Sequence, residues 1–452
     1  MRIIIIGAGP GGYETALEAA AKGHEVTLFN GNALGGTCLN EGCIPTKCLC
    51  RNAEMLSSFK EADKFGIDDF TFTLDFNKVV ERKREVVDTL RNGVEALLKA
   101  AKVTVVNAKA SFKDSHTVTA AGVDYEADYI IIATGSSSKS LPIEGADLEC
   151  VKSSSQMLEI EYIPESLTII GGGVIGMEFA GIFSSFGSKV TVIEFMKQIL
   201  PPFDSDIAKR LKQALSKKGV EIITGAAAKK ISQNEDYEIV VTYEVKGKEE
   251  TVVSSDLLMA VGRTPYTEGL NLEAAGVVYG PKGIPVDDMM RTNVDNIFAI
   301  GDVNARMMLA HVASFQGKRA LNAIDGREDS IRLDIVPSAV FTVPECGMAG
   351  LTEEACKEKG LEVVKGMSSF RANGKALALG EPEGICKLLF RKEDLVLVGA
   401  HIMGAGAADL AQQCADMMNA DMTLMKIKDV VFGHPTLSEV ILTACHNVKL
   451  KN

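Results

Sequence analysis

The chain has 452 residues, of which 46% are hydrophobic and 24% charged, and its formal net charge is -12. This length predicts about three domains, each able to bury its own core, and the acidic balance argues against a nucleic acid or an anionic membrane as a partner. Ten cysteines are too few for a disulfide scaffold, so we expect a reducing, cytoplasmic setting in which any disulfide is catalytic. The apolar run at residues 3–6 is too short for a signal peptide, and no 18-residue apolar stretch predicts a membrane span.

The N-terminal segment predicts a dinucleotide-binding unit. A short apolar strand at residues 3–6 enters the sequence GAGPGG at 7–12, and an alanine-rich helical stretch and a second strand at 25–29 follow. Gly7, Gly9 and Gly12 let the backbone turn and approach a pyrophosphate, while the helix N-terminus supplies amide donors. Asn30 closes the second strand, where an acid usually accepts hydrogen bonds from ribose hydroxyls.

The cysteine-containing segment at 35–47, GGTCLNEGCIPTK, places Cys38 and Cys43 five positions apart in the context of a turn and a helix start. Thiolates in such a position gain from the field of the helix N-terminus, which favours redox exchange. Two other interpretations stay open on this segment alone. One is a metal site that also uses Cys48 and Cys50, and the other is a set of free buried thiols.

Three stretches are predicted to belong with these sites. Residues 129–135 (YIIIATG) and 257–265 (LLMAVGRTP) each resemble a buried strand that ends on a glycine turn. Residues 296–303 (NIFAIGDV) end on Asp302, which is suited to holding a polyol hydroxyl. A charged helical stretch at 78–101 is interpreted as a solvated face.

The sequence TIIGGGVIG at 168–176 repeats the first pattern and leads to a strand at 189–193. The spacing from Gly7 to Asn30 is 23 positions, and so is the spacing from Gly171 to Glu194. Two copies with equal spacing are strong evidence for two dinucleotide sites. Glu194 would repel a 2′-phosphate, so the second site is predicted to favour NAD over NADP.

The sequence changes in character beyond residue 335. Strand-like runs at 338–342, 385–390 and 395–403 are followed by helical patterns around Cys414 and Met418 and past Glu439, with no phosphate-binding loop. This pattern predicts an α+β domain with a separate task.

The ordered motifs GAGPGG, GGTCLNEGCIPTK, ATG, GGGVIG, AIGDV and HPTLSE (434–439) resemble those of the pyridine nucleotide–disulfide oxidoreductase family from one end of the chain to the other. The resemblance implies an α/β fold with two Rossmann-like dinucleotide-binding domains and a C-terminal α+β dimerisation (interface) domain. The expected bounds are 1–145 for the first part of the FAD domain, 146–268 for the NAD domain, 269–334 for the part that completes the FAD domain, and 335–452 for the interface domain.

The resemblance also implies roles for individual residues. Cys43 would be the thiol nearest the flavin and Cys38 the interchange thiol, while His434 would act as acid/base with Glu439 orienting its imidazole. Lys47 and Glu178 would pair beside the flavin, and no metal is expected. The residues expected to bind FAD are Gly7, Gly9, Gly12, Asn30, Thr37, Lys47, Thr134, Gly135, Gly301, Asp302 and Ala310. The residues expected to bind NAD are Gly171, Gly173, Gly176, Glu194, Gly262 and Arg263.

The implied activity is the oxidation of dihydrolipoamide by NAD+ through FAD and a Cys38–Cys43 disulfide. The implied partner is the lipoyl-carrying protein of a 2-oxoacid dehydrogenase or glycine cleavage complex. Because family members complete each active site with the partner subunit's histidine, a homodimer is expected. Two alternatives stay open: an NAD(P)H-dependent reductase of another small disulfide, similar to glutathione or mercuric reductase, and a non-catalytic flavin-binding scaffold.

The chain departs from the family pattern at a few positions. Asn30 replaces the usual acid at the adenosine ribose of FAD, which puts the affinity for FAD in question. Gln316 stands where a Glu is more usual, and Ala405 where a Pro is common. Phe432 and Gly433 replace the usual His-Ala before the catalytic histidine, and none of these changes removes a group that the chemistry requires.

Overall fold

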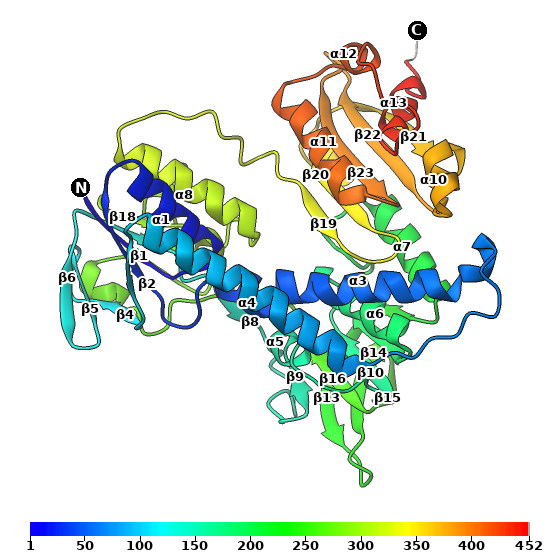
Figure 1. Ribbon diagram of the computed structural model, residues 1–452, viewed down its shortest axis with the longest axis horizontal. Helices are drawn as coiled ribbons and strands as arrows, with labels where there is room; N and C mark the ends of the chain where they lie inside the picture. The colour runs from blue at the N-terminus through cyan, green and yellow to red at the C-terminus, as the bar shows by residue number, and fades with distance from the viewer. Residues whose placement is uncertain (451–452) are drawn as a thin grey trace.

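The computed structural model describes residues 1–450, which form three lobes (Figure 1). The N-terminal lobe is built on a sheet with the strand order β18-β7-β1-β2-β3, in which all neighbours are parallel. Its strands are β1 (Arg2–Ile6), β2 (Glu25–Phe29), β3 (Thr104–Val106), β7 (Tyr129–Ile132) and β18 (Ile297–Ala299). The last strand comes from a segment that follows the second lobe in the chain, so the chain leaves this lobe and returns to it.

The alternation of side chains along β1 explains how this lobe is layered. Ile3 and Ile5 pack toward the helices α1 (Pro10–Ala21) and α8 (Ala310–Ile324), while Ile4 and Ile6 pack toward a small antiparallel sheet. That small sheet consists of β4 (Ala110–Phe112), β5 (Thr117–Ala120) and β6 (Val123–Glu126). A parallel sheet covered on both faces needs such continuous apolar strands.

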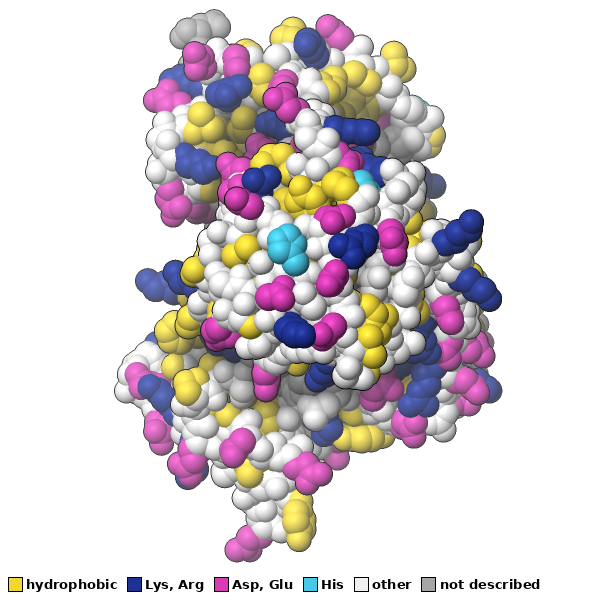
Figure 2. Space-filling view, turned by 90° about the vertical axis from the view of Figure 1, so that its left-hand side faces the viewer, with side chains coloured by type: hydrophobic (Ala, Val, Ile, Leu, Met, Phe, Trp, Pro, Cys, Tyr) yellow, Lys and Arg dark blue, Asp and Glu magenta, His cyan; other side chains and the backbone are white. Residues whose placement is uncertain are grey.

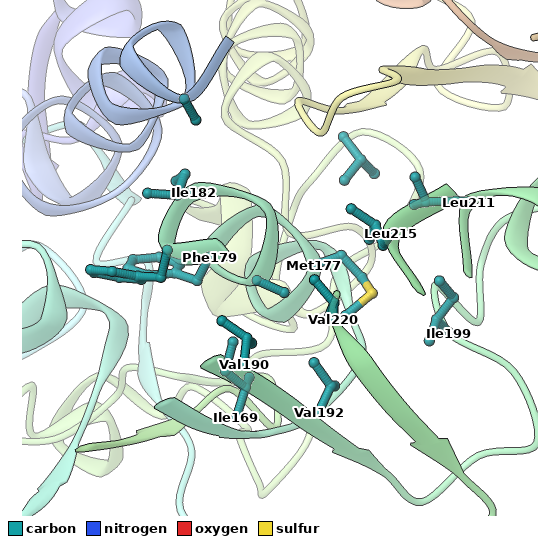
Figure 3. Close-up of a cluster of buried hydrophobic side chains, with 14 of the residues drawn as sticks. Ile169, Met177, Phe179, Ile182, Val190, Val192, Ile199, Leu211, Leu215 and Val220 are labelled. Carbon is teal, nitrogen blue, oxygen red and sulfur yellow. The ribbon is translucent and has the colours of Figure 1, made fainter. Parts of the chain in front are cut away.

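The second lobe repeats this plan. Its parallel sheet has the order β12-β11-β10-β16-β9, and a three-stranded antiparallel sheet, β13-β14-β15, covers one face. The strands are β9 (Val151–Lys152), β10 (Ser166–Ile170), β11 (Lys189–Glu194), β12 (Glu221–Thr224), β13 (Ala226–Gln233), β14 (Ile239–Val245), β15 (Lys248–Ser254) and β16 (Asp256–Met259). On the other face, side chains from β10 and β11 meet those of α6 (Val174–Phe186) and α7 (Ser205–Lys217), including Ile169, Val192, Met177 and Leu211 (Figure 3). The duplicated layers confirm the internal repeat that the two glycine motifs predict.

The C-terminal lobe contains an antiparallel sheet with the order β19-β20-β23-β22-β21. Its strands are β19 (Ser338–Val340), β20 (Cys346–Gly350), β21 (Val363–Ser369), β22 (Ile385–Arg391) and β23 (Leu397–Met403). Its helices are α9 (Glu353–Glu358), α10 (Gly374–Leu379), α11 (Ala407–Asn419), α12 (Leu424–Lys428) and α13 (Glu439–His446). The α+β prediction is confirmed, although β20 and β21 were not predicted. Both missed strands hold a glycine against which a helix packs closely, Gly347 under α11 and Gly366 under α13, and glycine weakens the strand pattern.

Two long helices connect the lobes (Figure 1). Helix α3 (Cys43–Lys60) packs against both α6 and α4 (Phe76–Ala100). Helix α4 is solvated on its outer face, as predicted, but it also buries a stripe that includes Val79, Val87 and Leu98. The remaining elements within residues 1–450 are α2 (Gly36–Glu41), α5 (Ser154–Met157), β8 (Ser136–Ser138) and β17 (Arg263–Pro265), together with four short 3₁₀ helices.

The surface carries mixed charge. On the face drawn in Figure 2, acidic and basic side chains are interspersed. Of the helices formed by residues 1–450, none combines the length and the apolar character needed to cross a membrane.

Candidate active site between two dinucleotide loops

The two glycine-rich loops have the same geometry. Gly7 and Gly171 both have a φ of +112°, and a Cβ on Gly7 or Gly171 would meet the carbonyl of Ala133 or Ala260, which directly follows the neighbouring strand. The helices that follow, α1 and α6, have no side-chain N-cap, so their first amides are left for a ligand. Such a cradle suits a pyrophosphate at each helix N-terminus.

A single cavity of about 1760 Å³ is lined by both loops. Most of the predicted site residues lie in its wall. On the FAD side they are Gly7, Gly9, Asn30, Thr37, Lys47, Thr134, Gly135, Gly301, Asp302 and Ala310. On the NAD side they are Gly171, Gly173, Glu194, Gly262 and Arg263, and Cys38, Cys43 and Glu178 also line the cavity. The volume and the two cradles suit two dinucleotides placed end to end.

Gly12 and Gly176 are not part of the cavity wall. A Cβ on Gly12 would meet the carbonyl oxygen of Gly7, and a Cβ on Gly176 would meet that of Gly171. Both glycines therefore allow the helix to pack closely against its own loop, a role that shapes the site without contact with a ligand.

Three polar side chains on the FAD side form hydrogen bonds within the protein. Asn30 is buried, and its Nδ2 donates to Asn107 Oδ1 at 2.9 Å. The hydroxyl of Thr134 donates to the carbonyl of Tyr266 at 2.6 Å, so this side chain joins the first lobe to the second. Asp302 accepts a hydrogen bond from the hydroxyl of Ser136.

On the NAD side, the carboxylate of Glu194 is held by the loop itself. One oxygen accepts from Gly172 N and the other from Met196 N, and the side chain is buried at the end of β11. The guanidinium of Arg263, also in the cavity wall, is held by Ser136: Nε and Nη2 donate to the hydroxyl and the carbonyl of Ser136, each at 2.7 Å. Burial lowers the pKa of Arg263, while the nearby carboxylate of Asp302 acts in the opposite direction.

Cys38 and Cys43 form a disulfide in the structure, with a Cα–Cα distance of 4.6 Å. Cys38 lies in α2, and Cys43 is the first residue of the 18-residue helix α3, as the turn-and-helix-start prediction requires. Gly36 has a φ of +57°, and a Cβ there would meet Gly9, so the disulfide segment packs directly on the first glycine loop. Reduction would leave the Cys43 thiolate at a helix N-terminus, which stabilises negative charge.

The neighbouring cysteines are in a different environment. Cys48 is buried and Cys50 half-buried, and burial raises the pKa of both thiols. Thiols of this kind react slowly because the thiolate is disfavoured. The disulfide between Cys38 and Cys43 favours the redox interpretation of this segment. A metal site would need the sulfurs of Cys38 and Cys43 as free ligands together with those of Cys48 and Cys50.

Lys47 and Glu178 are brought together across two lobes. Lys47 Nζ, on α3, lies 3.0 and 3.1 Å from the two carboxylate oxygens of Glu178 on α6. The backbone N–H of Phe341 donates to the same carboxylate at 3.0 Å, and Lys47 Nζ lies 4.6 Å from the centre of the Phe341 ring. The Glu178 side chain is only 4% exposed, so the pair holds a fixed position beside the disulfide helix.

His434 and Glu439 form a pair that lies outside the cavity of their own chain. His434 Nδ1 lies 3.0 Å from Glu439 Oε1, and Glu439 Oε2 accepts from Thr436 N at 2.9 Å. These two interactions hold the pKa of Glu439 below its usual value, so the carboxylate stays ionised. The His434 side chain is 77% exposed on the C-terminal lobe, which leaves its Nε2 free to face another subunit.

Sequence reasoning did not identify Ser136, Asn107 or Phe341. Ser136 directly follows the ATG motif at 133–135, and its position next to that motif could have identified it. Asn107 and Phe341 contact the site from segments that carry no motif, and only the fold brings them to Asn30, Lys47 and Glu178.

Comparison with known proteins identifies the class. Residues 1–317 match the family described as pyridine nucleotide-disulphide oxidoreductase, and residues 336–445 match the dimerisation domain of that family. The chain therefore belongs to the pyridine nucleotide–disulphide oxidoreductase family. Membership confirms the predicted enzyme class, its cofactors FAD and NAD, and the homodimer.

Particular relatives are similar over almost their whole length. The chain is 41% identical over 449 residues to a protein of Geobacillus stearothermophilus named dihydrolipoyl dehydrogenase, covering 98% of this chain and 94% of the relative. A Bacillus subtilis protein with the same name is 39% identical over 448 residues, covering 98% and 97%. Among solved structures, LpdA of Mycobacterium tuberculosis has a TM-score of 0.91 at 28% identity, with 99% of each chain covered. The HOCl-induced flavoprotein disulfide reductase RclA of Escherichia coli has a TM-score of 0.88 at 29% identity, covering 99% of this chain and all of the other.

Proposed function

We propose that the chain oxidises dihydrolipoamide on the lipoyl-carrying protein of a 2-oxoacid dehydrogenase or glycine cleavage complex, and that the electrons pass through FAD to NAD+. The observation that carries the proposal is the Cys38–Cys43 disulfide at the N-terminus of α3, in a cavity shared with both glycine loops. The 38–41% identity to relatives named dihydrolipoyl dehydrogenase supports the choice of substrate. A cytoplasmic location and the division at residues 145, 268 and 334 are part of the same proposal.

Each predicted site residue has a role that its surroundings support. The first glycine loop, Thr37 and Ala310 would hold FAD together with Asn30, Thr134, Gly135, Gly301 and Asp302. The second loop, Glu194 and Gly262 would hold NAD. Arg263 lines the NAD side of the cavity and would also contact NAD, while its two hydrogen bonds to Ser136 fix the junction between these halves.

The thiol chemistry follows from the positions of the sulfurs. A substrate thiolate attacks Cys38 Sγ, the Cys38–Cys43 bond breaks, and the Cys43 thiolate leaves toward the positive end of α3. The second substrate thiol loses its proton to His434 and attacks the first substrate sulfur. Lipoamide is released as a disulfide, and Cys38 leaves as a thiolate that takes the proton from the imidazolium. The two electrons then lie in the reduced pair, with Cys38 as a thiol and Cys43 as a thiolate.

FAD, when bound, would supply a two-electron acceptor for this reduced pair and a hydride donor for NAD+. Lys47 and Glu178 form an ion pair in the cavity wall, with Lys47 on the helix that carries Cys43. Glu439 holds the Nδ1 of His434, which leaves Nε2 for the substrate sulfur and stabilises the imidazolium. The histidine that serves one disulfide belongs to the other subunit of the dimer.

The proposal is tested by stopped-flow spectroscopy of the purified holoenzyme. Dihydrolipoamide should reduce the enzyme rapidly and give a long-wavelength absorbance band from a thiolate against the flavin, and NAD+ should then reverse it. Reduced glutathione, offered at the same thiol concentration, serves as the control substrate. Faster reduction by glutathione would favour a reductase of another disulfide, and no reduction by any thiol would favour a flavin-binding scaffold.

A further inference from the structure

Asn373 is buried in the C-terminal lobe, between α10 and the turn that carries His434. It is 6% exposed, and both ends of its amide are used. Oδ1 accepts from Ala376 N at 2.9 Å, and Nδ2 donates to the carbonyl of Thr436 at 3.0 Å. A backbone N–H only donates and a carbonyl only accepts, so these two neighbours fix the orientation of the amide.

Thr436 connects this amide to the His434–Glu439 pair. Its N–H donates to Glu439 Oε2 at 2.9 Å, and the other oxygen of that carboxylate lies 3.0 Å from His434 Nδ1. The hydroxyl of Thr436 donates to Gly433 O at 2.7 Å, which closes the turn on the side before the histidine. A continuous series of hydrogen bonds thus leads from a buried amide to an exposed imidazole.

Packing contributes little to the position of this imidazole. The His434 side chain is 77% exposed and the Glu439 side chain 27% exposed within the chain, so hydrogen bonds must hold the pair. A carboxylate can orient an imidazole only if the carboxylate is itself held. Glu439 is held through Thr436, and Thr436 is held through Asn373.

We propose that Asn373 is a positioning residue for His434, acting through Thr436 and Glu439. This inference rests on the proposed function, in which His434 exchanges protons with the substrate thiols. Capping of α10 does not account for the choice of residue, because capping needs only the side-chain oxygen and Asp or Ser would serve as well. The nitrogen of Asn373 is what the Thr436 carbonyl requires.

The test separates the two ends of the amide. Asn373→Ser and Asn373→Asp keep an oxygen for the α10 cap and remove the donor to Thr436, and the Ser variant does so without adding charge. Thr352→Ala is the matched control, because Thr352 caps α9 in the same lobe by accepting from Ala355 N and makes no hydrogen bond to the His434 turn. The readouts are reduction of the holoenzyme by dihydrolipoamide, reduction by NADH with an artificial acceptor, and the thermal unfolding midpoint.

Both Asn373 variants should slow reduction by dihydrolipoamide by about tenfold or more, since small displacements of a catalytic group have large effects on rate. In the oxidation of dihydrolipoamide by NAD+, the loss should appear in kcat, with the KM for dihydrolipoamide within about twofold of the wild-type value. NADH turnover with the artificial acceptor should stay unchanged. Thr352→Ala should lower the unfolding midpoint without slowing reduction by dihydrolipoamide.

The proposal is wrong if Asn373→Ser reacts with dihydrolipoamide as fast as the wild type. It is also wrong if both half-reactions slow equally, or if Thr352→Ala shows the same loss, because either result would indicate a general structural effect. A His434→Gln variant distinguishes this failure from that of the proposed function. If His434→Gln keeps full dihydrolipoamide turnover, the acid/base role itself falls. If His434→Gln is inactive while Asn373→Ser is normal, only the positioning role falls.

Discussion

Lys47 and Glu178 are 131 positions apart in the sequence, yet the ammonium nitrogen of one lies 3.0 and 3.1 Å from both carboxylate oxygens of the other. The pair joins α3 of the first lobe to α6 of the second. The N–H of Phe341 adds a contact from the C-terminal part of the chain at 3.0 Å. Three segments of the chain therefore meet at one buried carboxylate beside the disulfide helix.

Removal of Lys47 should leave that carboxylate with too few partners. Lys47→Met is expected to destabilise the protein by about 1–3 kcal/mol in urea unfolding, which is modest for a buried pair because the lysine side chain is about one-third exposed. The double variant Lys47→Met/Glu178→Gln should lose less than Lys47→Met alone, since no buried charge remains. Strictly additive losses would mean that the two side chains do not interact energetically.

Replacing Cys38 or Cys43 by serine should have different effects on the absorbance spectrum and on the reactivity of the remaining thiol. With Cys38→Ser, the remaining Cys43 thiolate should still give the long-wavelength band against the flavin. With Cys43→Ser, the band should disappear and Cys38 should react with alkylating agents. Both variants should lose oxidation of dihydrolipoamide by NAD+, because neither can form the disulfide, but should keep NADH turnover with an artificial acceptor. Retention of the band only in Cys43→Ser would reverse the assigned roles.

Asn30 is expected to limit the affinity for FAD. Asn30→Glu should add a charge-assisted hydrogen bond to the ribose and tighten FAD binding by about tenfold, measured as the Kd of apoprotein from flavin fluorescence. Asn107→Ala should have the opposite effect, because Asn30 Nδ2 donates to Asn107 Oδ1 at 2.9 Å and would lose this support. Equal Kd values for wild type and Asn30→Glu would show that the amide is already sufficient.

Glu194 is expected to select the nicotinamide cofactor. Its carboxylate is held by Gly172 N and Met196 N, so it cannot turn away from a 2′-phosphate. The wild type should prefer NAD over NADP by at least about a hundredfold in kcat/KM, and Glu194→Gln should reduce that ratio by roughly tenfold or more. Comparable efficiency of the wild type with both cofactors, at one salt concentration, would contradict the assignment.

Glu345 should make stability depend on pH in the neutral range. Burial raises the pKa of this carboxyl to about 7, although the N–H of Ala408 donates to it at 2.6 Å and acts in the opposite direction. Between a pKa of 4.5 in the unfolded chain and about 7 in the folded one, the folded state holds more protons. The contribution of the Glu345 carboxyl to the free energy of unfolding is therefore complete below pH 4.5. It is lost as the pH rises through 7, and the loss is at most about 3 kcal/mol.

Glu345→Gln should remove this dependence. The free energy of unfolding of the wild type, minus that of Glu345→Gln, is expected to fall between pH 5 and pH 8. Glu95→Gln changes an exposed carboxyl on α4 and should give a profile parallel to that of the wild type. A difference between wild type and Glu345→Gln that stays constant with pH would show that this carboxyl does not titrate in the range.

Local features of the sequence predicted the two strand–glycine-loop–helix units, and the resemblance to the family supplied most of the residues of the cavity wall. The strand before each glycine loop is mostly apolar because both of its faces are covered, and Gly7, Gly12, Gly171 and Gly176 are required by the backbone that a Cβ on each would meet. The spacing of Cys38 and Cys43 predicted a dithiol, but the segment alone left a metal site and free thiols open, and the disulfide was implied by the resemblance to the family. Strands β20 and β21 were missed because their glycines serve helix packing, which is a tertiary requirement.

The sequence by itself indicated the groups that are proposed to carry the chemistry: two phosphate loops, a dithiol, and a histidine with a carboxylate five residues away. These are short-range patterns, and local backbone geometry is sufficient to define them. The tertiary structure alone decided that Arg263 turns to Ser136, that Asn107 orients Asn30, and that Asn373 reaches the turn of His434 from 63 positions before Thr436. It also decided that His434 lies outside its own chain's cavity. Such contacts join segments far apart in the chain, and only the packing of the lobes brings those segments within hydrogen-bonding distance.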